Sequence, residues 1–256
     1  MAAARLSAVI LVALIAWTAM AQADDLRRSF LPGISGQDKR RPLLKPVPPW
    51  TAVGRVNRRT GGFCSGTLIA PDQVLTAAHC LWNKRTNRLL GADALHFLAG
   101  YNRGEYLAHG RVRQIRLASD IKMDRQGRPA NPATDWAVLT LAAPLLGKPQ
   151  LRPIALAAAP DLAALGDGAA LLQAGYSRDR AHMLTVVDAC RLVGRRKSGS
   201  GILLLHDCDA TFGDSGSPVM MRIDGALRIV GIHVAALRRG GKDLGMAVRI
   251  PDALLE

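Results

Sequence analysis

The chain has 256 residues and a formal net charge of +14, a length sufficient for one large domain or two small ones with a sizeable core. A positive charge of this size is typical of proteins that are attracted to polyanions. The basic residues are nevertheless scattered in small clusters, without a basic helix or an aromatic stacking platform, which argues against a specific nucleic-acid site and favours a solvated basic surface. These clusters are Lys39-Arg40-Arg41, Arg195-Arg196-Lys197 and Arg238-Arg239.

Residues 1–23 have the layout of a secretory signal peptide. Arg5 is the only charge before an apolar run from Leu6 to about Met20, and Ala21-Gln22-Ala23 is a small-x-small cleavage site ahead of Asp24. The apolar run is short for a retained membrane anchor, and no other segment of the sequence is long and apolar enough to cross a bilayer. We therefore expect a secreted protein, periplasmic or extracellular, without stable membrane insertion.

Residues 24–48 are charged and rich in proline, which indicates an extended leader, such as a propeptide, or an arm that lies on the body of the protein. From Trp50 onward, short apolar runs are broken by Gly, Pro, Asn and Asp, a pattern that indicates an all-β sandwich or barrel. The Ala-rich stretch 155–165 favours a short helix, and the segment 143–153 marks the boundary between halves at 49–146 and 147–256. The expected strands are at 67–70, 73–76, 95–98, 112–117, 137–141, 169–174, 202–205, 227–234 and 246–250.

Four cysteines, Cys64, Cys80, Cys190 and Cys208, fit an oxidising compartment and two disulfides. Of the three possible pairings we favour Cys64–Cys80 with Cys190–Cys208, because each bond closes a short loop, worth about 3 kcal/mol in the chain-entropy model. A zinc site is the alternative. The sequence has no Cys-x-x-Cys pair, however, and we expect neither a metal nor another cofactor.

Ser215 lies in a glycine-rich stretch that supplies both a nucleophile and a place to stabilise charge. A serine hydroxyl is a poor nucleophile unless a base takes its proton and donors bind the oxyanion that it creates. Gly213 and Gly216 allow a tight loop to expose the Ser215 Oγ and to point the N–H groups of Gly213 and Ser215 at one spot. Taken alone, the stretch fits a surface turn better; it reads Ala210-Thr211-Phe212-Gly213-Asp214-Ser215-Gly216-Ser217-Pro218-Val219.

Two upstream residues supply the rest of a nucleophilic site. His79 follows Thr76-Ala77-Ala78, whose small side chains let the imidazole pack close to the backbone, and Cys80 ties that turn to the strand of Cys64. Asp135 stands at the mouth of the apolar strand 137–141, where a buried carboxylate accepts a hydrogen bond from the imidazole Nδ1–H and fixes its tautomer. Singly, each residue fits an ordinary turn, but with Ser215 they give the order His, Asp, Ser.

These stretches resemble the chymotrypsin/trypsin family of serine endopeptidases, from about Trp50 to Ile250. The matching motifs are Cys64 to Ile69, Thr76 to Cys80, Asp135 to Leu139 and Gly213 to Pro218. The chain order also separates it from subtilisins and from α/β-hydrolases. The resemblance implies two packed antiparallel six-stranded β-barrels, the first with His79 and Asp135 and the second with Ser215. It also implies a monomer acting on protein or peptide substrates through the mechanism of the family.

The resemblance suggests two competing specificities. Asp209 lies six residues before Ser215, where trypsin-like members place the carboxylate that selects Arg or Lys. His233 instead resembles the histidine with which glutamyl endopeptidases bind a substrate carboxylate. We favour cleavage after basic residues, although Asp209 also fits a loop cap and His233 an ordinary strand histidine. We interpret the neighbouring His206 and Asp207 as a surface coincidence rather than as metal ligands.

The chain departs from the family pattern at a few positions. Ser217 replaces the usual glycine, as is common among bacterial members, and Thr211 replaces a frequent cysteine, which makes Cys190–Cys208 less secure than Cys64–Cys80. Asp214 often receives a new N-terminal ammonium in this family, and a cut after Gly33 would supply one from Ile34. The alternative to an enzyme is a catalytically silent homologue that uses its basic surface as a binding module.

Overall fold

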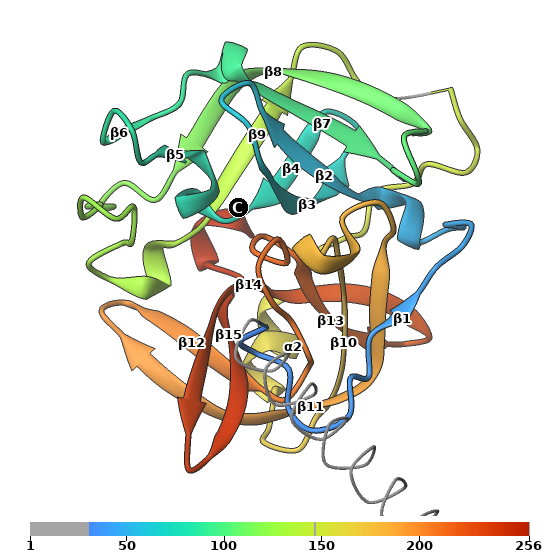
Figure 1. The fold of residues 1–256 in the computed structure, drawn as a ribbon. Helices are drawn as coiled ribbons and strands as arrows, with labels where there is room; N and C mark the ends of the chain where they lie inside the picture. Colours follow the sequence, from blue (N-terminus) through green and yellow to red (C-terminus); the bar gives the residue numbers. More distant parts are fainter. Residues whose placement is uncertain (1–30, 146, 256) are drawn as a thin grey trace, which may run out of the picture.

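The computed structural model describes residues 31–145 and 147–255. The predicted signal peptide, residues 1–23, lies outside the described residues, as does the start of the predicted arm. Within the described ranges no helix is both long and apolar enough to traverse a lipid bilayer. The residues form two β-barrels, one above the other in Figure 1.

The first barrel closes on itself in the order β2-β3-β4-β9-β8-β7. Alternation along its strands explains the closure: in β7 the side chains of Leu95, Phe97 and Ala99 are fully buried, whereas His96 and Leu98 are partly exposed. Successive side chains of a strand point to opposite faces, so this alternation directs one face into the barrel. Its strands are β2 (Val53–Arg58), β3 (Phe63–Ala70), β4 (Gln73–Thr76), β7 (Leu95–Ala99), β8 (Ala108–Leu117) and β9 (Ala137–Leu141).

The second barrel is a ring of six strands in the order β11-β10-β13-β14-β15-β12, closed by pairing of β12 with β11. The short strand β1 (Arg41–Pro42) adds to β11 from outside. Closure pairs the strand edges, which open sheets leave exposed. The strands are β10 (Ala170–Gly175), β11 (Thr185–Ser198), β12 (Gly201–His206), β13 (Pro218–Ile223), β14 (Ala226–Arg239) and β15 (Lys242–Arg249). The predicted pair of six-stranded antiparallel barrels is confirmed.

The connection between the barrels is hydrogen-bonded to both of them. Ile154 N donates to Leu68 O in β3, and Ala157 N donates to Ile229 O in β14, each at 2.9 Å. The predicted helix near 155–165 is confirmed as α2 (Ala159–Ala164). The described residues also form a small hairpin and six short 3-10 helices: β5 (Trp82–Asn83), β6 (Arg88–Leu89), η1 (Trp50–Ala52), η2 (Ala78–Leu81), η3 (Ala92–Ala94), η4 (Pro132–Thr134), η5 (Arg178–Arg180) and η6 (Asp252–Leu254).

Both predicted disulfides are present. Cys64–Cys80 joins β3 to η2, and Cys190–Cys208 joins β11 to the segment after β12. The first bond attaches the turn that carries His79 to the barrel. Two disulfides are typical of proteins from an oxidising compartment.

Candidate active site

Strand pairing brings His79 and Asp135 together. Thr76, the last residue of β4, pairs with Ala137, the first residue of β9, so the segments just beyond these two ends emerge side by side. The imidazole Nδ1 of His79 lies 2.7 Å from Asp135 Oδ2, and the backbone N–H of His79 donates to Asp135 Oδ1 at 2.9 Å. When Nδ1 donates this hydrogen bond to the carboxylate oxygen, Nε2 is the ring nitrogen that can act as a base. Asp135 is 4% exposed.

Ser215 lies in a tight loop whose glycines have no substitute. Gly213 (φ +95°) and Gly216 (φ +84°) have left-handed backbones, and a Cβ on them would lie 2.4 Å from Tyr176 O and 2.2 Å from Ser65 O. The first barrel anchors the loop, since Ser65 N donates to Ser215 O at 2.9 Å. The loop is therefore held at the junction of the two barrels.

The N–H of Gly213 has a fixed direction. The carbonyl of the preceding residue, Phe212, accepts a hydrogen bond from Arg178 N at 2.6 Å. In a trans peptide the N–H points opposite to the carbonyl, so the Gly213 N–H is turned away from Arg178. Among the described residues, neither Gly213 N nor Ser215 N donates to a protein acceptor. Both donors are available to a ligand.

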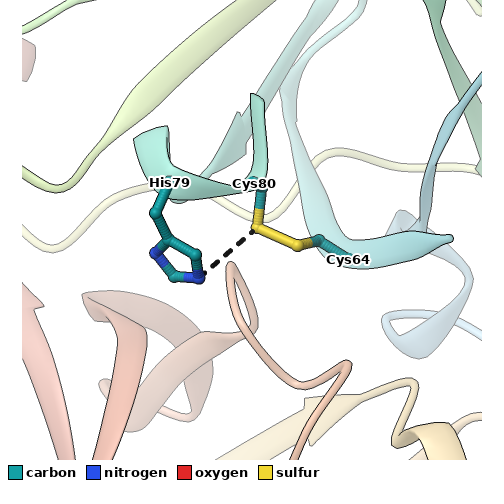
Figure 2. A group of neighbouring side chains, drawn as sticks. All are labelled: Cys64, His79 and Cys80. Atoms are coloured by element: carbon teal, nitrogen blue, oxygen red, sulfur yellow. Dashed lines mark hydrogen bonds between the residues drawn. A yellow bond between two sulfur atoms is a disulfide. The ribbon is translucent and has the colours of Figure 1, made fainter. Parts of the chain in front are cut away.

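His79, Asp135, Gly213 and Ser215 line a single cleft of about 960 Å³, to which both barrels contribute. His79 Nε2 lies 4.0 Å from Cys80 Sγ (Figure 2). The same sulfur lies 3.7 Å from Ser215 O. In the described part of the chain, Ser215 Oγ and His79 Nε2 are not hydrogen-bonded. Catalytic hydrogen bonds are often long in ligand-free sites and shorten when substrate binds.

Cys64, His79 and Cys80 bring three metal-type ligand atoms within 4.8 Å of one another (Figure 2). The two sulfurs are bonded to each other. Zinc needs thiolates, so this cluster lacks the sulfur ligands that such a site requires.

Asp209, which the sequence predicted for the substrate pocket, has partners in the N-terminal arm instead of in the cleft. Its carboxylate is buried and accepts hydrogen bonds from Ser35 N at 3.1 Å and Lys39 N at 2.8 Å. Asp209 is absent from the cleft lining, although its neighbours from Ala210 to Gly213 belong to it. The reason is that the N-terminal arm supplies the donors that satisfy this carboxylate.

His233 does line the cleft, and a second histidine stands behind it. His233 Nδ1 lies 3.3 Å from His206 Nε2, and both rings are buried. Burial lowers the pKa of His206 to about 4 and that of His233 well below its ordinary value, so both imidazoles are neutral. The interpretation of His206 and Asp207 as a surface coincidence is therefore wrong for His206, while Asp207 accepts a hydrogen bond from Arg191 N.

His206 reaches His233 across the intervening strand β15. Gly245 of β15 pairs with His206 of β12, and a Cβ on Gly245 would lie 2.0 Å from His206 Cε1. The missing side chain thus leaves room for the ring. No local sequence signal links positions 206, 233 and 245, which explains why the sequence did not predict this contact.

Asp214, beside Ser215, is buried, and burial raises its pKa to about 6. Its Oδ2 accepts hydrogen bonds from Ser177 Oγ at 2.6 Å and from Thr211 N at 2.9 Å. Within the described ranges it has no ion-pair partner. A new ammonium at Ile34 would provide one, and that activation step stays a prediction.

Two six-stranded barrels with a serine, a histidine and an aspartate at their junction define the class of chymotrypsin-like folds. Residues 34–254 match the family model described as Trypsin, and the chain belongs to the trypsin family. A Drosophila melanogaster protein described as "Modular serine protease" is 31% identical over 131 residues, 49% of this chain and 21% of that protein. The chain thus spans about a fifth of that relative's length.

Among solved structures, a Glu endopeptidase in complex with MPD is similar to this chain. Its TM-score is 0.67 with 18% sequence identity, and the match covers 87% of this chain and 95% of that one. At this identity the likeness concerns the fold.

Proposed function

We propose that the protein is a secreted serine endopeptidase in which Ser215 is the nucleophile, His79 the base and Asp135 the residue that orients the base. The observation that carries this proposal is the hydrogen bond of 2.7 Å between His79 Nδ1 and Asp135 Oδ2 beside a cleft that also contains Ser215. This bond engages Nδ1 and leaves Nε2 as the nitrogen of His79 that can act as the base in the cleft.

The chemistry follows the serine-protease template. As Ser215 Oγ attacks the peptide carbonyl, its proton passes to His79 Nε2, and the free N–H groups of Gly213 and Ser215 bind the oxyanion. His79 then gives the proton to the leaving amine, and an ester with Ser215 remains. Water, deprotonated by the same nitrogen, hydrolyses the ester and restores the hydroxyl.

The test is hydrolysis of an internally quenched peptide by the mature protein and two serine variants. Ser215→Ala should abolish turnover. Ser217→Ala, which removes a buried hydroxyl two residues further on, is the matched control and should keep most of it. Equal turnover by Ser215→Ala and wild type would contradict the proposal. A correctly folded wild type without any turnover would favour the silent binding module.

The geometry favours an acidic residue at P1, the residue whose carbonyl is attacked, over the basic residue that the sequence suggested. The Asp209 carboxylate already accepts hydrogen bonds from Ser35 N and Lys39 N of the arm. His233, in contrast, lines the cleft. In the neutral tautomer in which His233 donates from Nε2 to a substrate carboxylate, its Nδ1 accepts a hydrogen bond from His206 Nε2–H. His206 is placed to fix this tautomer, because its Nε2 lies 3.3 Å away.

A panel of peptides that differ only at P1 tests this specificity. We expect Glu to be preferred over its neutral isostere Gln and over Arg, and we expect His233→Gln to remove the Glu/Gln discrimination. Asp209→Ser should leave the ranking unchanged. A preference for Arg or Lys that Asp209→Ser abolishes would reverse the assignment.

A further inference from the structure

The cleft carries more positive charge than its own acids neutralise. Five basic side chains line it, against two carboxylates. Both carboxylates are already engaged within the cleft: Asp135 with His79, and Asp124 with Arg128 at 3.0 Å. A cleft lined by one sign of charge concentrates ligands of the opposite sign. The basic side chains are Arg58, Lys84, Arg85, Arg128 and Arg178.

Arg58, the last residue of β2, is held beside the catalytic turn. Its Nη1 donates to Cys80 O at 3.4 Å, and its buried Nε has no hydrogen-bond partner among the residues that the structure describes. Gly62 leaves space for the guanidinium, since a Cβ there would lie 2.5 Å from Arg58 Nη2. Burial lowers the pKa of Arg58 and the nearby charge of Arg178 lowers it further. Neither arginine forms an ion pair with a carboxylate among the described residues.

Arg178 lines the same cleft as Arg58. Its guanidinium carbon lies 5.3 Å from the centre of the Phe212 ring, and Phe212 is 52% exposed. Phe63 of the first barrel lies close to Gly213, because a Cβ on Gly213 would lie 3.1 Å from Phe63 Cε2, and 2.9 Å from the backbone N of Arg178. Arg58, Arg178, Phe63 and Phe212 all line the cleft that contains Gly213.

We call the part of the cleft lined by Arg58, Phe63, Arg178 and Phe212 the arginine wall. This wall lies on the leaving-group side of the scissile bond. In the proposed mechanism His79 Nε2 protonates the leaving amine, so the leaving group occupies the space beside this nitrogen. That space borders the Cys64–Cys80 disulfide, since Nε2 lies 4.0 Å from Cys80 Sγ (Figure 2). Arg58 is bonded to the Cys80 carbonyl, and Phe63 directly precedes Cys64. The substrate chain beyond the scissile bond must therefore pass this wall.

We propose that Arg58 and Arg178 form an anion-binding subsite for acidic side chains at P1′ and P2′, the first two residues after the scissile bond. Phe63 and Phe212 offer apolar surface for the stems of those side chains. This inference rests on the proposed endopeptidase function, and it names a substrate class: peptides with acidic residues just after the cleavage point.

Binding to the inactive Ser215→Ala protein tests the subsite without turnover. The probes are two fluorescein-labelled octapeptides, identical up to the scissile bond, that continue with Asp-Glu or with the neutral pair Asn-Gln. We expect the acidic peptide to bind at least about tenfold more tightly at low salt, because hydrogen bonds to charged groups are the strong ones. The difference should shrink as salt rises.

In the Ser215→Ala protein, a second substitution, Arg58→Gln or Arg178→Gln, should reduce the preference for the acidic peptide severalfold. Adding Arg196→Gln, which removes an equal charge from β11 outside the cleft, should leave it unchanged. Equal binding of the two peptides would overturn the subsite. So would an equal loss with Arg196→Gln, which would indicate general attraction of polyanions, nucleic acid included, to the basic surface.

Turnover of the same peptides by the Ser215 protein separates this inference from the proposed function. Turnover without a preference for the acidic pair would contradict the proposed anion-binding subsite and leave the proposed endopeptidase function intact. Selective binding of the acidic peptide without any turnover by the wild-type protein would contradict the endopeptidase function. It would also contradict the placement of P1′ and P2′ at this wall, and only an anion-binding cleft would remain.

Discussion

Asp135 uses one oxygen for the backbone of His79 and the other for its ring. The backbone N–H is always a donor, so Asp135 Oδ1, which it contacts, must be an acceptor. The ring nitrogen, in contrast, changes its role with the tautomer. The function of Asp135 in the proposed mechanism therefore depends on the second oxygen, Oδ2.

Asp135→Asn should preserve the fold and reduce kcat by about 10⁴-fold, the loss known for this change in the triad template. The amide oxygen stays on the backbone N–H, and the NH₂ group then faces Nδ1. This forces the proton onto Nε2, where it blocks the base. Steady-state kinetics with circular dichroism as a folding control make the measurement, and a kcat within tenfold of wild type would contradict the assigned role.

Asp214 is a different case, because it is a buried acid that forms no ion pair with the described residues. Its pKa is about 6 in the folded chain, against 3.8 for the free side chain. Ionisation of Asp214 therefore destabilises the folded state. The contribution of Asp214 to the free energy of unfolding is most favourable below pH 3.8 and is lost as the pH rises through 6. Both of its hydrogen bonds go to Oδ2, so an amide oxygen can accept both.

Asp214→Asn should accordingly stabilise the uncut chain at pH 8 by about 3 kcal/mol and have no effect below pH 4. Urea unfolding from pH 3.5 to 8, in the Ser215→Ala background to prevent self-digestion, gives the comparison. A stabilisation that does not change with pH would show that ionisation of Asp214 is not its cause.

At the scale of elements, the N-terminal arm (residues 31–42) is a structural part of the second barrel. Arg40 is 4% exposed and forms ion pairs with Asp38 at 2.9 Å and Asp179 at 2.8 Å. Arg180, beside Asp179, reaches back to Asp38 at 2.7 Å. These charges join the arm to the turn η5, whose first residue is Arg178. The arm thus helps to hold the turn that orients the Phe212–Gly213 peptide.

Asp209→Ala should destabilise the protein by about 2–4 kcal/mol, because it leaves two backbone donors of the arm without their buried acceptor. Asp188→Ala is the matched control: it removes an exposed pair with Arg41 and should cost under about 0.5 kcal/mol. Chemical unfolding compares the two. Equal effects would show that the arm does not depend on Asp209.

The strands differ in how well their sequences predicted them. β4 and β9 were predicted at their observed bounds because each is a short apolar run between turn residues. β11 was missed because its middle and end carry polar and basic residues, among them Arg195, Arg196 and Lys197, which were interpreted as a surface cluster. β13 was missed because Pro218 follows the serine loop directly and suggests a turn. In both cases barrel closure outweighs local preference.

The site shows the same limit. Chain order and spacing predicted that His79, Asp135 and Ser215 belong together, because these motifs are local. The partners of Asp209 lie about 170 residues away in the chain, and His206 meets His233 across a third strand. Contacts of this kind depend on how the elements are arranged, which a local pattern does not encode.

At the scale of the whole molecule, the site exists only where the two barrels meet. Ser65 of the first barrel is fully buried; its Oγ donates to Gly213 O at 3.0 Å and accepts from Tyr176 N at 2.8 Å. Its backbone N–H holds Ser215 O. One residue of the first barrel thus anchors both ends of the serine loop in the second, and the base and the nucleophile come from different barrels.

The most direct test of this arrangement is covalent labelling of the mature protein with a fluorophosphonate, followed by peptide mapping in a mass spectrometer. Such probes react with a serine only when a neighbouring base activates it. We predict one adduct per chain, located on Ser215 and absent from His79→Ala. A correctly folded wild-type chain that stays unlabelled, or that carries the adduct on another residue, would contradict the proposal that the two barrels assemble a reactive serine at their junction.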